Sequence, residues 1–151
     1  DQALPEGQTA LGICYMKGEG VEQDYKRAYS LFQEAAKQKY PEAQFQLGVM
    51  YYGGEGVQAN NKEAVKWFRM AAEQGHCPAQ LNLGICYYEG TGVPMDNLES
   101  YYWLSLAANL CPPQYADEYN KTRDKVKAEL NENEIEKADI RVKEWMYKNK
   151  Q

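Results

Sequence analysis

The chain has 151 residues, of which 44% are hydrophobic and 26% charged, and its formal net charge is −5. This length is typical of one domain with a core of its own. The acidic balance argues against a nucleic-acid partner, which would require a basic surface, and no apolar run is long enough to span a membrane. The chain has one histidine, His76, which excludes a multi-histidine metal site within the chain.

The sequence repeats itself with a period of 36 residues. Nine positions are identical in three consecutive copies, including the Leu-Gly pairs at 11–12, 47–48 and 83–84. Such self-similarity is the sequence signature of a repeat architecture. The copies span residues 5–40, 41–76 and 77–112, after a short leader (1–4) and before a C-terminal segment (113–151).

Each copy predicts two helices, named A and B in chain order. In the second copy, Pro41 is suited to the first turn of helix A, and the glycines that follow Tyr52 are expected to end it. Helix B is expected to begin after Asn60 and to end at Gly75.

Three Asx residues are the expected N-caps of the B helices. Asn60 is followed by Glu63, and Asp96 by Glu99, which is the spacing of a capping box. The first copy has Asp24 followed by Arg27, so it keeps the cap and lacks the reciprocal carboxylate.

The residue spacing gives each helix one inward face. Ala43, Leu47 and Tyr51 recur every four residues on helix A, and Gly48 beside them indicates a close approach of helix B. The apolar face of helix B carries Ala64, Trp67, Phe68 and Ala71. One such hairpin cannot bury its apolar face alone, so the copies are expected to stack into an α-solenoid.

These copies resemble the Sel-one-like repeat (SLR) family, a relative of the tetratricopeptide repeat. The second copy carries the family pattern throughout, at Ala43, Leu47-Gly48, Tyr51, Gly54, Gly56-Val57, Ala64, Trp67, Ala71-Ala72 and Gln74-Gly75. The resemblance implies an all-α, right-handed α-solenoid of three helix-turn-helix repeats with a C-terminal helical cap. The first copy departs from the pattern at Gly7, Leu31 and Lys39, and the third at Ser100, Leu110 and Cys111.

The segment after the third copy predicts two more helices. Pro112 and Pro113 interrupt the helical pattern, and a helix is expected over about 114–130. A second helix is expected from Asn131 to about Lys148, with an apolar stripe at Ile135, Ala138, Val142, Trp145 and Met146. This segment resembles the C-terminal closing segment of bacterial family members. Because the first repeat begins almost at residue 1, we expect more chain upstream.

Four cysteines need an explanation. Cys14 and Cys86 are two repeats apart, too far for a disulfide. Cys77 and Cys111 lie in successive inter-repeat loops, where geometry leaves a bridge open. We expect free, mostly buried thiols, which favour a reducing compartment, with a Cys77–Cys111 bridge as the alternative.

Nothing in the sequence predicts catalysis, a metal or another cofactor. His76 beside Cys77 has no further spaced ligand, so we interpret it as a turn residue. The repeated Gly-x-Gly follows a helix and is interpreted as a helix stop, not a phosphate loop.

A second apolar face of the A helices is the candidate partner site. It carries Met16 in the first copy, Phe45, Val49 and Tyr52 in the second, and Leu81, Ile85 and Tyr88 in the third. One interpretation is an apolar and aromatic groove on the concave face, which would take a peptide or a helix. The other is inter-repeat core, which favours Phe45, Val49, Leu81 and Ile85 as packing residues and Met16, Tyr52 and Tyr88 as exposed ones.

The family resemblance implies a non-catalytic scaffold or adaptor for protein partners. The settings it suggests are bacterial host interaction and envelope regulation. Two alternatives stay open. One is a targeting module of a larger enzyme or effector, and the other is a homo-oligomeric spacer joined through its N-terminal edge. We expect a monomer, and the sequence leaves the compartment and the partner open.

Overall fold

The computed structural model describes residues 4–150, so of the expected leader only Leu4 is described. Over these residues the chain forms eight α-helices, one short 3₁₀-helix and no strand. It divides into two compact units, Asp1–His76 and Cys77–Gln151. None of the described helices has the length and apolar character needed to cross a bilayer.

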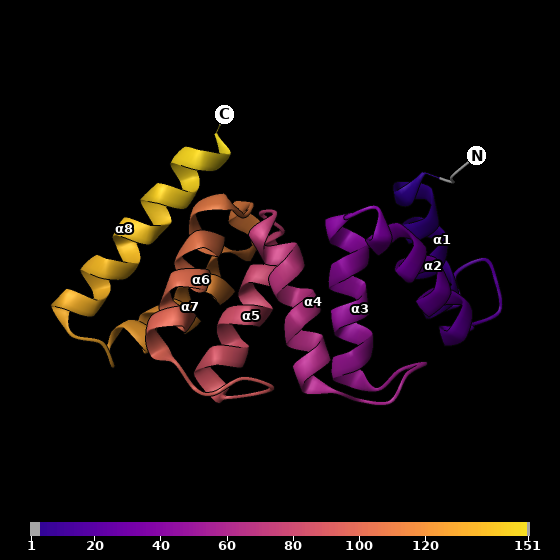
Figure 1. Ribbon diagram of the computed structural model, residues 1–151, viewed down its shortest axis with the longest axis horizontal. Helices are drawn as coiled ribbons and strands as arrows, with labels where there is room; N and C mark the ends of the chain where they lie inside the picture. Colours follow the sequence, from indigo (N-terminus) through magenta and orange to yellow (C-terminus); the bar gives the residue numbers. More distant parts are fainter. Residues whose placement is uncertain (1–3, 151) are drawn as a thin grey trace. The chain divides into compact units, whose positions relative to one another are not determined.

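The first unit consists of the first two repeats, each an antiparallel helical hairpin (Figure 1). Its helices are α1 (Pro5–Lys17), α2 (Tyr25–Lys37), α3 (Pro41–Gly53) and α4 (Asn61–Glu73). Helix α1 packs on α2, α3 packs on α4, and α2 joins the two hairpins by packing on α3. The expected A and B helices of these two copies are therefore confirmed.

The helix ends in this unit are set by the expected residues. Gly18 and Gly54 end the A helices in the left-handed conformation, with φ of 72° and 70°. The side chains of Asp24 and Asn60 each accept a hydrogen bond from the N–H three residues later. The capping box expected at Asn60 is incomplete: the Asn60 N–H donates to the Tyr51 carbonyl at 2.9 Å, and the Glu63 carboxylate pairs with Lys66 at 2.5 Å.

Each hairpin of the first unit closes where a glycine meets an aromatic ring. A Cβ on Gly48 would lie 2.5 Å from the Phe68 ring, and one on Gly12 would lie 2.6 Å from the Phe32 ring. Phe32 and Phe68 are both buried. The close approach predicted for Gly48 is confirmed. In each hairpin the phenylalanine ring of helix B packs directly on the glycine backbone of helix A.

The second unit contains the third repeat and the C-terminal segment. Its helices are α5 (Cys77–Glu89), α6 (Asn97–Leu110), a 3₁₀-helix (Pro113–Tyr115), α7 (Ala116–Lys127) and α8 (Glu132–Asn149). The helix expected over 114–130 is shorter than predicted, because Pro113 begins a 3₁₀ turn and α7 ends at Lys127. Asn131 and Glu134 form a complete capping box at the start of α8.

Helix α6 is covered by the C-terminal segment as well as by α5. It packs on both α7 and α8. The Arg141 guanidinium of α8 lies 4.0 Å from the centre of the Tyr102 ring, and its Nη1 donates to the Glu99 carboxylate at 2.6 Å. The Tyr101 hydroxyl donates to Asp139 at 3.2 Å. These contacts explain why α6 carries apolar residues on faces where the earlier B helices are polar.

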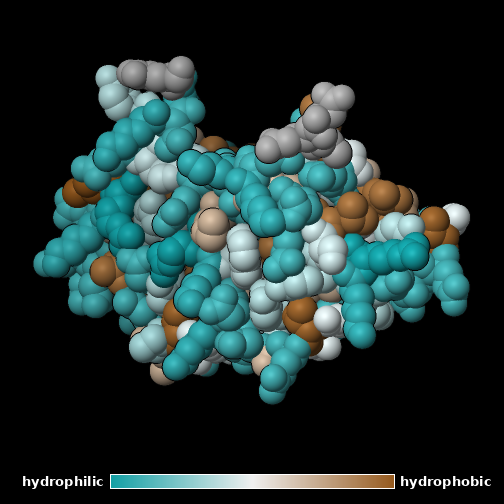
Figure 2. Space-filling model, turned by 45° about the vertical axis from the view of Figure 1, so that its right-hand side comes forward, coloured by the Kyte–Doolittle hydropathy of each residue, from teal (hydrophilic) through white to brown (hydrophobic). Residues whose placement is uncertain are grey.

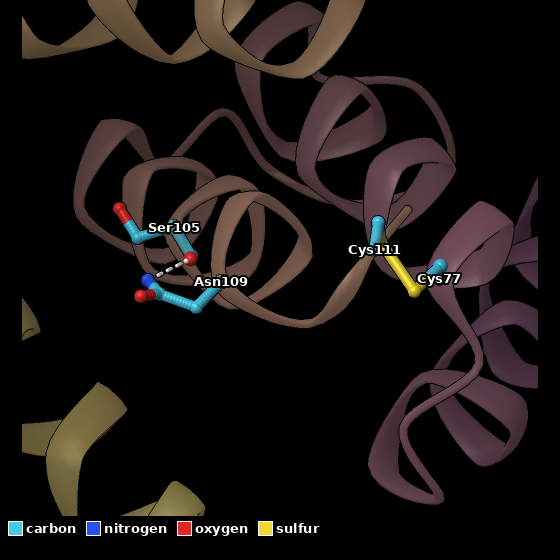
Figure 3. The surroundings of a disulfide bond; sticks show 4 residues. All are labelled: Cys77, Ser105, Asn109 and Cys111. Carbon is cyan, nitrogen blue, oxygen red and sulfur yellow. Dashed lines mark hydrogen bonds between the residues drawn. A yellow bond between two sulfur atoms is a disulfide. The ribbon is translucent and has the colours of Figure 1, made fainter. Parts of the chain in front are cut away.

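The expectation of four free thiols is wrong. Cys77 and Cys111 form a disulfide with a Cα–Cα distance of 5.5 Å (Figure 3). Cys77 is the first residue of α5 and Cys111 follows the last residue of α6. Because the two helices are antiparallel, these positions meet at the same end of the hairpin. Cys14 and Cys86 are free. The argument from thiols for a reducing compartment therefore does not hold.

Candidate protein-interaction surfaces

Helix α3 presents one side to the core and another to solvent. Leu47 is fully buried, and the Tyr51 hydroxyl lies 2.8 Å from the Tyr29 hydroxyl of α2. The next residue, Tyr52, is 52% exposed. Tyr51 therefore stabilises the stack of two repeats, whereas the Tyr52 ring is available to a partner.

Four other residues proposed for the second apolar face are buried or half-buried. The Phe45 ring lies 4.9 Å from the His76 ring and 5.8 Å from the Phe68 ring, so it packs within its own repeat. Val49 and Ile85 are half-buried, and Leu81 is buried. Their burial favours the interpretation that these four residues pack inside the protein and do not line a groove. Partner binding at this face stays a prediction.

Met16 and Tyr88, which were expected to be exposed, are half-buried. Met16 packs against the core of the first unit. The Tyr88 hydroxyl donates to the Glu129 carboxylate at 3.2 Å, and Asn97 donates to the same carboxylate at 2.8 Å. The hydrogen bond to Glu129 raises the pKa of Tyr88, and the negative charge of this carboxylate adds to the effect because the phenolate would lie beside a like charge. Tyr88 is thus partly covered by the C-terminal segment, which the sequence did not indicate.

The outer edge of the first repeat forms a second candidate surface. Leu11 is 43% exposed, although Leu47, its counterpart one repeat later, is fully buried. A hollow of about 480 Å³ lies between α1 and α2, lined by Leu11, Tyr15, Lys26, Arg27, Ser30 and Leu31. We call these six residues the α1–α2 edge. Its apolar floor and basic rim distinguish it from the acidic chain as a whole.

Arg27 is the central polar group of the α1–α2 edge. Its Nη1 donates to the Tyr15 hydroxyl at 3.1 Å, and the guanidinium carbon lies 5.4 Å from the centre of the Tyr15 ring. Its Nε pairs with Asp24 at 3.4 Å, on the side of a neighbouring hollow that Glu22 also lines. Two of the five guanidinium N–H groups are thus directed to partners in the chain, and Arg has donors left for a ligand.

His76, which was expected to be a turn residue, connects the end of the second repeat to the start of α3. His76 Nε2 lies 2.9 Å from Glu42 Oε2, and this hydrogen bond lowers the pKa of the Glu42 carboxyl against the opposing effect of its partial burial. Over residues 4–150, no group of three His, Cys, Asp or Glu side chains is placed to hold a metal ion. The geometry of His76 and Glu42 supports a structural contact between α3 and the end of α4.

Burial of Cys86 raises the pKa of its thiol to about 11. A thiol with this pKa is almost entirely protonated near neutral pH, and the thiolate is the nucleophilic form. Cys86 is therefore unsuited to nucleophilic chemistry, and it packs as a small apolar residue.

Two of these features were missed from the sequence. The partial cover of Tyr88 depends on Glu129, 41 residues later, which no local pattern indicates. The exposure of Leu11 has no signal in the repeat pattern, because Leu11, Leu47 and Leu83 occupy the same repeat position and the other two are fully buried.

The repeat geometry and the residues that produce it match a known family. A family model described as the Sel1 repeat matches residues 5–40, 41–76 and 77–110. The chain belongs to the Sel1 repeat family. Sel1 repeat proteins are typically non-catalytic scaffolds for protein interactions.

Solved Sel1 structures share the fold. A Sel1 repeat protein from Oxalobacter formigenes is 38% identical, with a TM-score of 0.70, over 74% of this chain and 46% of that one. A protective antigen of uropathogenic Escherichia coli that displays an SLR fold is 25% identical, with a TM-score of 0.76, over 96% of this chain and 38% of that one. This chain therefore spans less than half the length of either Sel1 protein. No curated protein matches it.

Proposed function

We propose that this chain is a non-catalytic protein-interaction scaffold, which holds a peptide or a helix of a partner protein on the face of α3 that carries Tyr52. The main observation behind the proposal is that Tyr52 is 52% exposed. Its neighbour Tyr51, in contrast, contacts Tyr29 of α2 and so belongs to the packing between the two repeats. Tyrosine provides a large apolar ring and a hydroxyl at one site, and it is enriched among the residues that dominate binding energy.

Two further observations support a scaffold. Helical repeats provide a rigid surface without a catalytic constellation, and the family typically has this role. On the face drawn in Figure 2, apolar side chains lie in small patches on a mostly hydrophilic surface. The likeness to bacterial Sel1 proteins, one of them a protective antigen, suggests bacterial host interaction or envelope regulation as the setting.

Selection of peptides from a displayed library tests this proposal directly. The immobilised chain is offered the library, and peptides that also bind the Tyr52→Arg variant are removed in a second round. We expect a family of peptides that depends on Tyr52. If every selected peptide binds both proteins equally well, the Tyr52 face is not the site.

One observation favours a second candidate function, a targeting module within a larger enzyme or effector. The matched region is 46% of one solved relative and 38% of the other. The mass of the endogenous protein tests this candidate, because a gene product of about 17.3 kDa leaves no room for a catalytic domain.

A further inference from the structure

The loop that follows α3 carries a carboxylate beside the exposed ring of Tyr52. Glu55 is exposed three residues after Tyr52, and a Cβ on Gly53 would lie 3.6 Å from Glu55 Cγ and 3.8 Å from Glu55 Cδ. The Glu55 side chain therefore lies against the last turn of α3, and the carbonyl end of a helix has a partial negative charge. This corner of the Tyr52 face thus combines an aromatic ring with two sources of negative potential.

Backbone contacts hold the loop that carries Glu55 in place. Gly56 has a φ of 72°, and a Cβ on it would lie 2.8 Å from Tyr25 Cβ and 2.9 Å from the Tyr25 carbonyl oxygen of α2. The N–H groups of Gly54 and Glu55 both donate to the Met50 carbonyl, at 2.8 and 3.2 Å. Because the loop is already ordered, a ligand that binds to Glu55 does not have to order it.

The first repeat shows which group this corner of the protein accepts. Lys17 and Glu19 are the counterparts of Gly53 and Glu55, and Lys17 Nζ lies 3.8 Å from Glu19 Oε1. The second repeat has glycine in place of the lysine, and α3 has no basic residue in its last turn. Over residues 4–150, no ion pair involves Glu55. The first repeat therefore supplies from its own chain a cation that the second repeat does not supply.

We propose that the Tyr52 face binds a basic side chain of the partner peptide, with its cation at the place beside Glu55 that Lys17 Nζ has beside Glu19. This inference rests on the proposed function and specifies the chemistry of the ligand. The cation pairs with the Glu55 carboxylate and contacts the face of the Tyr52 ring, which attracts cations through its π electrons. Since Glu55 is the only charged residue between positions 43 and 61, no basic side chain of this segment competes with the ligand.

Three synthetic peptide libraries test the proposal. Their members are random peptides of equal length with Lys, Gln or Glu fixed at the central position. Each library is offered to the immobilised parent chain and to Tyr52→Ser, which removes the ring without a change of charge, and the difference is the Tyr52-dependent binding. We expect about fivefold more of it from the Lys library than from the Gln library, the combined size of an exposed cation–π contact and an exposed ion pair. The Glu library is expected to give the least.

Four variants show whether Glu55 causes the preference for Lys. Glu55→Gln removes the carboxylate, and Gly53→Lys adds the cation of the first repeat at a position where a Cβ makes only ordinary contacts, so both are expected to abolish the preference. Two matched controls are expected to keep it. Glu73→Gln removes an exposed charge at the end of α4, and Gly53→Gln adds a long side chain without a charge.

The possible outcomes separate this inference from the proposed function. Equal Tyr52-dependent binding from the three libraries would overturn the inference and leave the scaffold proposal standing. A preference for Lys that survives Glu55→Gln or Gly53→Lys would also overturn the inference, and so would a preference that the two controls abolish equally. No Tyr52-dependent binding from any library would overturn both proposals.

Discussion

Gly48 of α3 lies against the ring of Phe68 of α4, so closely that a methyl group on Gly48 would be 2.5 Å from Phe68 Cδ1. Phe68 is buried, so other side chains surround its ring. We therefore expect Gly48→Ala to reduce the free energy of unfolding by about 1–3 kcal/mol, the usual cost of overpacking. Urea unfolding followed by circular dichroism measures the change.

Gly7 is the matched control for this substitution. It is also a helical glycine of the first unit, and a Cβ added there meets nothing within 4 Å. Because alanine favours helix by up to about 1 kcal/mol over glycine, Gly7→Ala is expected to be neutral or stabilising. Equal losses for the two variants would contradict the account, because the contact with Phe68 exists only at Gly48.

The Glu42–His76 contact predicts a dependence of stability on pH. The pKa of Glu42 is lowered in the folded protein, chiefly by its hydrogen bond with His76. The contact therefore stabilises the fold above the unfolded pKa of about 4.3, and this contribution is lost as the pH falls through the lowered pKa of the folded state. Glu42→Gln is expected to be less stable than the parent at pH 7, with a difference that shrinks by pH 3.

Glu34→Gln is the control for the loss of one negative charge. Glu34 is exposed and pairs with Lys37 on the same helix, so its replacement is expected to change stability by less than about 0.5 kcal/mol at either pH. A difference between Glu42→Gln and the parent that is independent of pH would contradict the account of the Glu42–His76 contact.

The cysteines predict a pattern of thiol reactivity. With Cys77 and Cys111 joined, the denatured unreduced chain is expected to titrate two thiols, and the reduced chain four. In the native protein Cys14 is expected to react faster than Cys86, which is buried and has a pKa of about 11. Four reactive thiols before reduction would show that the disulfide is absent.

Arg141 predicts how strongly α8 is attached to α6. It stacks on the Tyr102 ring and pairs with Glu99 at 2.6 Å. Arg141→Met removes both contacts and is expected to lower the free energy of unfolding by about 1–2 kcal/mol. Arg141→Lys keeps the charge and loses the planar stack, so an intermediate loss is expected. A fully stable Arg141→Met variant would show that apolar packing alone attaches α8.

Most of the fold follows from the sequence because its determinants are local and repeated. Gly54 ends α3 and Asn60 caps α4 through contacts within a few residues, and the same types of residue recur at each period of 36. The close approach at Gly48 follows from the same repetition. Position within the repeat therefore predicts both the helices and the faces that they bury.

The misjudged features depend on contacts between residues far apart in the chain. Cys77 and Cys111 are 34 residues apart, as are Glu42 and His76, and in each pair the start of helix A meets the end of helix B. An antiparallel hairpin of two helices with nearly equal length places these positions together. The sequence analysis placed the two cysteines in separate inter-repeat loops and therefore did not predict their contact. The cover of Tyr88 depends on Glu129, outside the repeats, where repetition gives no guide.

A quantitative pull-down from bacterial lysate tests the central claim, that this chain is a scaffold which binds through Tyr52. The parent chain is compared with Tyr52→Arg and with Tyr147→Arg, which changes a 72% exposed tyrosine of α8. The account predicts at least one partner that the parent and Tyr147→Arg retain and that Tyr52→Arg loses, with all three proteins equally stable. Partners that all three proteins retain equally would contradict it.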